Sequence, residues 1–402
     1  MREPSSDLAH GARPGMPLLA AASLGATFLL CAGGASAQAS LNDPAIRARI
    51  SAAVERERVV YGGRTPVPGV LVTVSNPSGS FVRGFGYEDL ATKAPMLAAD
   101  HFRIGSNTKV FVITVLLQLV DEGYLELDDP LSRFDLGVKI PNARSITVRE
   151  VCEMRSGLFE AYDVPQIQSS QVTPASHWDP HTLIRWAVRE KPYFAPGKGY
   201  KYSNTNYLIL GLLVESLTHD TIEDQIRKRV IVRFGLRHTS FPTTQAMPSP
   251  WAHGYGLDAD RNWQDVSGTI PVSLMWAAGA MVSDVADMDR WVKLYVTGKT
   301  NSARTQRDRL RCVWTGVGNL SFGLGIGCSA GWLGYTGGLP GYNTATYYEP
   351  KSKTTITAWV DFQSGGPTPG AANAIFRDIA RIMTPNHVPF LTTGASKGKS
   401  GL

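Results

Sequence analysis

The chain is long enough and apolar enough to fold around a large hydrophobic core. It has 402 residues, 43% of them hydrophobic, which excludes a disordered protein and a small domain that depends on disulfides or metals. The formal net charge is +6. The Lys and Arg residues are scattered and form no run with interleaved aromatic residues, so we expect no nucleic-acid partner.

The first 37 residues have the layout of a secretory signal peptide. Arg2 and Arg13 precede an apolar run from Leu18 to Ala32, and the small residues Ala35-Ser36-Ala37 follow it. The apolar run is too short and too rich in Ala and Gly to span a membrane comfortably. We therefore expect an exported protein, periplasmic or secreted, with no stable membrane insertion after cleavage.

The chain beyond this leader contains three cysteines. Cys312 and Cys328 flank a short segment of strand and turn residues, and in an oxidising compartment they can form a disulfide, which the sequence leaves open. Cys152 falls in a helical pattern with apolar neighbours and is expected to be a small buried residue.

The N-terminal part of the mature chain predicts a helix and then a hairpin. Asn42-Asp43-Pro44 combines an N-cap with a proline at the first helical position, and we expect the helix to continue to about Val59. Two β-rich runs, 69–75 and 80–87, are separated by Asn76-Pro77-Ser78-Gly79. This spacing is typical of an antiparallel hairpin.

The middle of the chain, from about Leu131 to Gly268, is helical and loop-rich. Its apolar spacing predicts helices over 146–154, 181–189, 206–217 and 222–232. This segment is expected to form a helical lobe, about 131–268, inserted into a sheet lobe.

The C-terminal part repeats the arrangement of the start. Strands are predicted at 344–348 and 354–360, followed by a helix that ends near Pro385. The sheet lobe then comprises about 42–130 and 269–385, and 386–402 is expected to be a flexible tail. The fold class is α+β: an antiparallel sheet flanked by helices, with the helical insertion lobe.

Gly105-Ser106-Asn107-Thr108-Lys109 opens a helix, and a spacing of three places Ser106 and Lys109 on one face. A serine hydroxyl becomes a strong nucleophile when a base takes its proton, and a partly buried lysine with a lowered pKa can do so. The alternative is an N-cap serine with a surface lysine, because this tetrapeptide pattern is common by chance. A second copy, Ser396 to Lys399, has no helix behind it and is discarded.

Two further segments strengthen the first copy. Tyr202-Ser203-Asn204 precedes a predicted helix and offers a phenol and an amide. A phenol held beside an ammonium can have a lowered pKa and share proton transfer with the lysine. Gly334-Tyr335-Thr336-Gly337-Gly338 precedes the strand at 344–348, and its glycines allow a substrate backbone to lie close.

With these motifs in this order, the chain resembles the serine β-lactamase and penicillin-binding D-alanyl-D-alanine carboxypeptidase superfamily, in its class C-like branch, which also contains esterases and amidases. The resemblance covers about residues 42 to 385. Besides the motifs above, it rests on Leu127-Asp128-Asp129-Pro130, Ile146-Thr147-Val148-Arg149, Ser156-Gly157-Leu158 and Ala277-Ala278-Gly279-Ala280.

The resemblance implies a role for each matching residue. Ser106 would form an acyl-enzyme, Lys109 and Tyr202 would exchange protons with it, and Asn204 would hydrogen-bond the substrate amide. The backbone N–H groups of Ser106 and Gly338 would form an oxyanion hole. Trp276 falls where related carboxypeptidases place an aromatic wall of the cleft, and a core tryptophan is the alternative.

One position departs from the family pattern. The third motif normally begins with Lys or His, and here Tyr335 takes that place, followed by Thr336, Gly337 and Gly338 as further substrate-binding candidates. A neutral phenol supplies no positive charge for a substrate carboxylate, although Thr336 can still hydrogen-bond one. Penicillins and D-Ala-D-Ala ends are therefore less certain substrates.

Other motifs carry less weight. Gly394-Ala395-Ser396-Lys397-Gly398 fits the nucleophile elbow of α/β-hydrolases but has no strand before it or helix after it. His177-Trp178-Asp179-Pro180-His181 contains metal-capable side chains, but no Cys or Glu cluster completes a metal shell. We expect no metal and no organic cofactor.

The sequence thus predicts a serine hydrolase that acts on a small molecule or a peptidoglycan peptide, with a D-alanyl-D-alanine carboxypeptidase-like activity foremost. An esterase or amidase and a class C-like β-lactamase are the alternatives with the same chemistry. A penicillin- or peptidoglycan-binding sensor without turnover is the non-enzymatic alternative.

Overall fold

The computed structural model describes residues 39–62, 65–170, 172–363 and 370–390. The expected signal peptide, the second Ser-x-x-Lys copy and the elbow-like Gly394-Ala395-Ser396-Lys397-Gly398 lie outside the described residues. No helix in the described part of the chain has the length and hydropathy that a membrane span requires.

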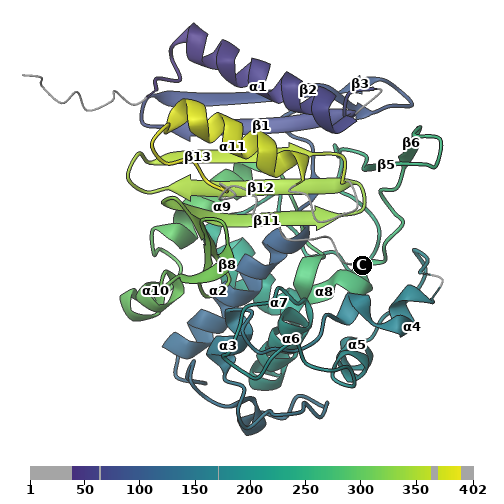
Figure 1. Cartoon of the computed structure of the whole chain (residues 1–402), viewed down its shortest axis with the longest axis vertical. Coiled ribbons are helices and arrows are strands. Elements are labelled where there is room, and N and C mark those ends of the chain that lie inside the picture. The colour runs from purple at the N-terminus through teal and green to yellow at the C-terminus, as the bar shows by residue number, and fades with distance from the viewer. Residues whose placement is uncertain (1–38, 63–64, 171, 364–369, 391–402) are drawn as a thin grey trace, which may run out of the picture. The chain divides into compact units, whose positions relative to one another are not determined.

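The largest element of the fold is an antiparallel sheet. Within the described residues it has nine strands in the order β3-β2-β1-β13-β12-β11-β10-β9-β8 (Figure 1). Two-stranded pairs, β4 with β7 and β5 with β6, lie outside it. The strands are β1 (Gly69–Asn76), β2 (Gly79–Asp89), β3 (Ala94–Pro95), β4 (Phe102–Arg103), β5 (Tyr255–Leu257), β6 (Trp263–Asp265), β7 (Val282–Ser283), β8 (Val313–Val317), β9 (Leu320–Phe322), β10 (Gly327–Ser329), β11 (Trp332–Leu339), β12 (Tyr342–Glu349) and β13 (Thr354–Val360).

Helices cover both faces of the sheet, which explains why every residue of β12 and β13 is buried. The α-helices are α1 (Pro44–Gly62), α2 (Thr108–Asp121), α3 (Val148–Cys152), α4 (Pro165–Gln168), α5 (Pro180–Ala187), α6 (Thr205–Thr218), α7 (Ile222–Ile226), α8 (Val272–Gly279), α9 (Val285–Val296), α10 (Ala303–Arg309) and α11 (Ala371–Met383).

The first and the last helix of the described chain, α1 and α11, pack together on one face of the sheet. Figure 1 shows α1 and α11 side by side over this face, where Ile50 and Val54 of α1 join Ile375 and Ile379 of α11 in one hydrophobic core. Both helices and the β1–β2 hairpin were predicted from the sequence and are confirmed. The α+β fold class is confirmed as well.

The helical region packs against the other face and contains the larger core. The motif around His177 begins a helix, because Asp179 accepts hydrogen bonds from the backbone N–H groups of His181 and Thr182 and Pro180 follows it. The predicted helix at 222–232 consists of two parts, α7 and a π-helix at Arg227–Val232.

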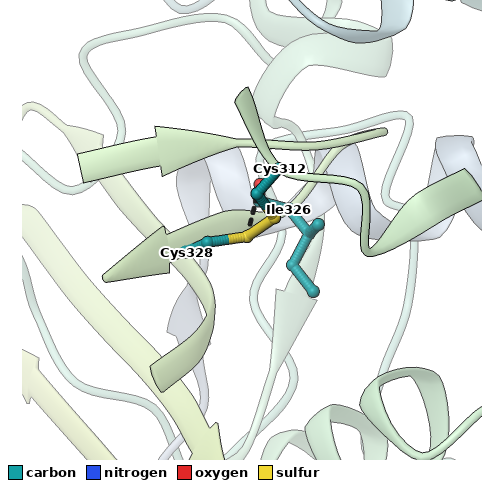
Figure 2. The surroundings of a disulfide bond; sticks show 3 residues. All are labelled: Cys312, Ile326 and Cys328. Atoms are coloured by element: carbon teal, nitrogen blue, oxygen red, sulfur yellow. Dashed lines mark hydrogen bonds between the residues drawn. A yellow bond between two sulfur atoms is a disulfide. The ribbon is translucent and has the colours of Figure 1, made fainter. Parts of the chain in front are cut away.

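A disulfide links the segment before β8 to strand β10 at one edge of the sheet. Cys312, just before β8, is bonded to Cys328 in β10 across a Cα–Cα distance of 6.5 Å (Figure 2). The disulfide thereby joins the start of the β8–β9 hairpin to β10, the third strand counted from this edge. Cys152 is buried and free, as expected.

Candidate active site

Ser106 lies in a 3-10 turn, η1 (Gly105–Asn107), that leads directly into α2. The turn packs against the sheet, where Asn107 Nδ2 donates to Thr344 Oγ1 of β12 at 2.9 Å. Ser106 is half-buried at the N-terminal end of the helix, where backbone N–H groups have no partners within the helix and the helix dipole favours negative charge.

Lys109 is the partner that the helical spacing predicted. Its Nζ lies 2.9 Å from Ser106 Oγ, 2.8 Å from Asn204 Oδ1 and 2.6 Å from the Ala278 carbonyl oxygen. The side chain is fully buried, and this desolvation lowers the pKa of Lys109 to about 7. A large fraction of Lys109 is therefore neutral near pH 7 and can accept the proton of Ser106.

Tyr202 reaches the same oxygen from the turn before α6. Its hydroxyl donates to Ser106 Oγ at 2.7 Å. The expected lowering of its pKa is wrong, because burial raises the pKa of Tyr202 and outweighs the opposing hydrogen bond with Ser106. Lys109 Nζ faces the ring of Tyr202, 5.1 Å from its centroid, rather than its oxygen. Tyr202 is thus a neutral phenol, a form that can donate a proton.

Glu160 is a site residue that the sequence interpretation missed. Its Oε2 accepts hydrogen bonds from Asn204 N at 2.7 Å and Asn204 Nδ2 at 3.1 Å. These bonds turn Asn204 Oδ1 toward Lys109, so Asn204 connects the carboxylate to the lysine. Burial raises the pKa of Glu160, while its bonds with Asn204 and Tyr162 and the nearby charge of Lys109 oppose this effect.

The glycines of the third motif allow the turn of Ser106 to approach β11. A Cβ atom on Gly337 would lie 2.0 Å from the Ile104 carbonyl oxygen, and one on Gly105 would lie 2.9 Å from Gly338 N. Larger residues would therefore force the two segments apart. The approach places the Gly338 backbone beside the turn of Ser106, where the expected oxyanion hole requires it.

Tyr335 and Thr336 line a cavity of about 270 Å³ together with Tyr202. Tyr335 is 3% exposed and packs edge-on against Phe322 with a centroid distance of 5.8 Å. None of the described residues that line this cavity is charged. The position that is cationic in the family pattern is therefore a buried phenol in an apolar wall.

Trp276 does not line the cavity beside Tyr202. Its Nε1 donates to Glu223 Oε1 at 2.9 Å, and it borders a separate cavity together with His177 and His181. The ring packs against α6, where a Cβ atom on Gly211 would lie 2.7 Å from it. Its contacts are therefore those of a largely buried tryptophan.

In the described part of the chain, no group of three His, Cys, Asp or Glu side chains is arranged to hold a metal ion.

The family model for Beta-lactamase matches residues 47–380, which includes every group described above. The chain belongs to the beta-lactamase family. The chain is therefore a member of the serine hydrolase superfamily of the β-lactamase and penicillin-binding protein type, and the resemblance inferred from the motifs is confirmed.

Solved structures of this family share the fold over most of the chain. The D-stereospecific amidohydrolase from Streptomyces sp. is 26% identical, with a TM-score of 0.73 over 84% of this chain and 98% of that chain. The D-amino acid amidase from Ochrobactrum anthropi SV3 has a TM-score of 0.74 at 22% identity, over 84% of this chain and 99% of that one.

Curated relatives match a smaller part of the chain. The putative penicillin-binding protein PbpX of Bacillus subtilis (strain 168) is 23% identical over 73% of this chain and 71% of its own length. Protein flp of Staphylococcus aureus (strain COL) is 25% identical over 59% of this chain, but the match spans only 47% of flp.

Proposed function

We propose that this protein is an exported serine amidohydrolase that cleaves D-aminoacyl amides, and related esters, through an acyl-enzyme on Ser106. The hydrogen-bonded cluster carries this proposal: Ser106 Oγ lies 2.9 Å from Lys109 Nζ and 2.7 Å from Tyr202 Oη. A neutral amine and a neutral phenol on one serine oxygen supply the proton acceptor and the proton donor of acyl transfer.

The reaction follows from the protonation states. Ser106 Oγ attacks the substrate carbonyl carbon while Lys109, whose pKa is about 7, takes the hydroxyl proton. Tyr202 donates a proton to the leaving nitrogen or oxygen, which leaves a phenolate at Tyr202 and an ammonium at Lys109. The C–N or C–O bond breaks and leaves an acyl-serine ester. Water then attacks this ester with the same groups in reverse roles, which releases the acid and restores Ser106.

Charge develops on the carbonyl oxygen during both steps. The backbone N–H groups of Ser106 and Gly338 are the groups that we assign to stabilise it, because the close approach of Gly105 to Gly338 brings the two segments together. A preorganised donor of this kind typically contributes about 10²–10³ in kcat.

The substrate class rests on the similarity to the D-stereospecific amidohydrolase and on Tyr335. A D-alanyl-D-alanine carboxypeptidase is the second candidate, supported by the sequence blocks. Its substrate ends in a carboxylate, and the cavity lined by Tyr202 and Tyr335 offers no cation to bind one. An uncharged amide needs none. A β-lactamase would face the same lack of a cation.

Intact-mass spectrometry and product analysis with D-alaninamide, a D-Ala-D-Ala peptide, an activated ester and benzylpenicillin test this proposal. Wild-type protein and Ser169→Ala, a control at an exposed serine, should turn over the amide and form an acyl adduct with the ester, whereas Ser106→Ala should do neither. An adduct on folded Ser106→Ala would refute the nucleophile. Turnover of the peptide but not the amide would favour the carboxypeptidase, and a permanent adduct without product would favour a sensor.

A further inference from the structure

We propose that the cavity beside Tyr202 binds the leaving group of the substrate and selects uncharged, apolar and preferably aromatic groups. This inference rests on the proposed acyl transfer at Ser106 and extends it to the part of the substrate that is released.

The proton donor fixes the side of the leaving group. Lys109 is enclosed, with its Nζ bonded to Ser106, Asn204 and Ala278 and no exposed surface. Tyr202 is half-buried and lines the cavity with one part of its side chain while its hydroxyl lies 2.7 Å from Ser106 Oγ. A group that receives its proton from Tyr202 therefore lies next to this cavity.

The walls suit a flat apolar group. Tyr200, Phe322, Tyr335, Tyr347 and Phe390 contribute aromatic rings, which can stack on or meet the edge of an aromatic ligand. The hydroxyl of Tyr335 has no partner of standard hydrogen-bond geometry among the described residues, although it lies close enough to Tyr202 for the two phenols to interact. As a neutral phenol, Tyr335 cannot neutralise an anion.

The cavity also has an open strand edge and an apolar entrance. Strand β11 pairs with β10 only at Trp332, Leu333 and Gly334, so within the described residues the stretch from Tyr335 to Leu339 pairs with β12 alone. At the entrance, Val317 at the end of β8 lines the cavity and is 61% exposed. An exposed apolar side chain at this place can contact a leaving group that extends outward.

Three D-alanyl esters that differ only in the alcohol test the proposal: methyl, benzyl and 4-carboxybenzyl. The alcohols have similar basicity, so differences in kcat/KM report contacts rather than bond strength. We expect the benzyl ester to exceed the methyl ester by about tenfold or more, as burial of a phenyl ring implies. The 4-carboxybenzyl ester should lose most of this gain, because nothing in the cavity compensates its charge.

Variants at the entrance separate binding from folding. Val317 is exposed, so Val317→Lys should fold normally and raise the ratio of 4-carboxybenzyl to benzyl turnover several-fold, and Val317→Asp should lower it. Val313→Lys is the matched control, because Val313 is also exposed on β8 but does not line the cavity. It should leave the ratio unchanged.

The outcomes distinguish this inference from the proposed function. Equal kcat/KM for methyl and benzyl esters, or equal effects of Val317→Lys and Val313→Lys, would overturn the leaving-group site while turnover that depends on Ser106 still stands. If Ser106→Ala hydrolyses the esters as fast as wild type, the proposed function itself is wrong, and the leaving-group site with it.

Discussion

Replacement of Lys109 by Met tests whether the lysine is as strongly desolvated as its surroundings imply. Burial lowers the pKa of Lys109 from 10.5 to about 7. Between these two values the unfolded chain binds a proton that the native state does not bind, so the free energy of unfolding rises with pH. Below pH 7 both states bind the proton and the cost of burying the charge is complete. Above 10.5 neither state does.

The size of the expected change in the free energy of unfolding follows from the pH range between these two pKa values. Each pH unit within it contributes about 1.4 kcal/mol, so from pH 7.5 to 9.5 the wild type should gain about 2.5 kcal/mol relative to Lys109→Met. Methionine has a similar volume and no charge. It removes the hydrogen bonds of Lys109 with Ser106 Oγ, Asn204 Oδ1 and the Ala278 carbonyl oxygen, but that loss is nearly constant over this pH range.

Urea unfolding of both proteins at several pH values measures the difference. Lys139→Met, at an exposed lysine, is the control and should show no comparable pH dependence relative to wild type. A free-energy difference between wild type and Lys109→Met that stays constant from pH 7.5 to 9.5 would show that Lys109 retains its proton in the native state. It would then be no base for Ser106.

Two further variants test the surroundings of the catalytic groups. Glu160→Gln removes the negative charge that favours the Lys109 ammonium. The midpoint of the rising limb of kcat/KM against pH should therefore move to lower pH by roughly one unit. Glu153→Gln, at another buried carboxyl, is the control and should not move this midpoint. A midpoint that stays or rises would contradict a charge effect. Tyr335→Lys should create a charge-assisted hydrogen bond of about 1.5–3 kcal/mol, hence about tenfold or more in kcat/KM for a D-Ala-D-Ala peptide but not for a neutral ester. Tyr335→Phe is its control, and an equal change for both substrates would show a packing role alone.

The elements that the sequence predicted well are those with a local pattern. The β1–β2 hairpin has a turn signal between alternating strands, and α6 has an apolar spacing that matches its observed bounds, Thr205–Thr218. The order of the strands was not predicted, because β1 pairs with β13 through contacts between residues such as Val70 and Val360. Such contacts lie far apart in sequence and leave no local pattern.

The residues of the site also divide into those that a local sequence pattern predicts and those that it does not. Helical spacing brings Ser106 to Lys109, but Tyr202 is 96 residues from Ser106, and it was linked to them only by the order of the motifs, the chemistry of its phenol and the family resemblance. The Ala278 carbonyl that binds Lys109 has no side-chain signature. Glu160 lies two residues beyond a recognised block, and a single acidic residue there does not reveal its burial. The wrong direction for the pKa of Tyr202 has the same origin, because desolvation depends on the folded surroundings.

We assign proton transfer and contact with the leaving group largely to different residues, which suggests how a site of this kind can change its substrate. Lys109, the proposed proton acceptor, is hydrogen-bonded to Asn204 and Ala278, so we expect substitutions there to alter proton transfer for every substrate. Val317 is 61% exposed, and exposed substitutions typically change stability by less than about 0.5 kcal/mol. Tyr202 belongs to both parts, since it bonds Ser106 and lines the cavity. If the cavity binds the leaving group as proposed, we expect the substrate range to change at the entrance of the cavity at little cost in stability, and a change at Tyr202 to alter the chemistry as well.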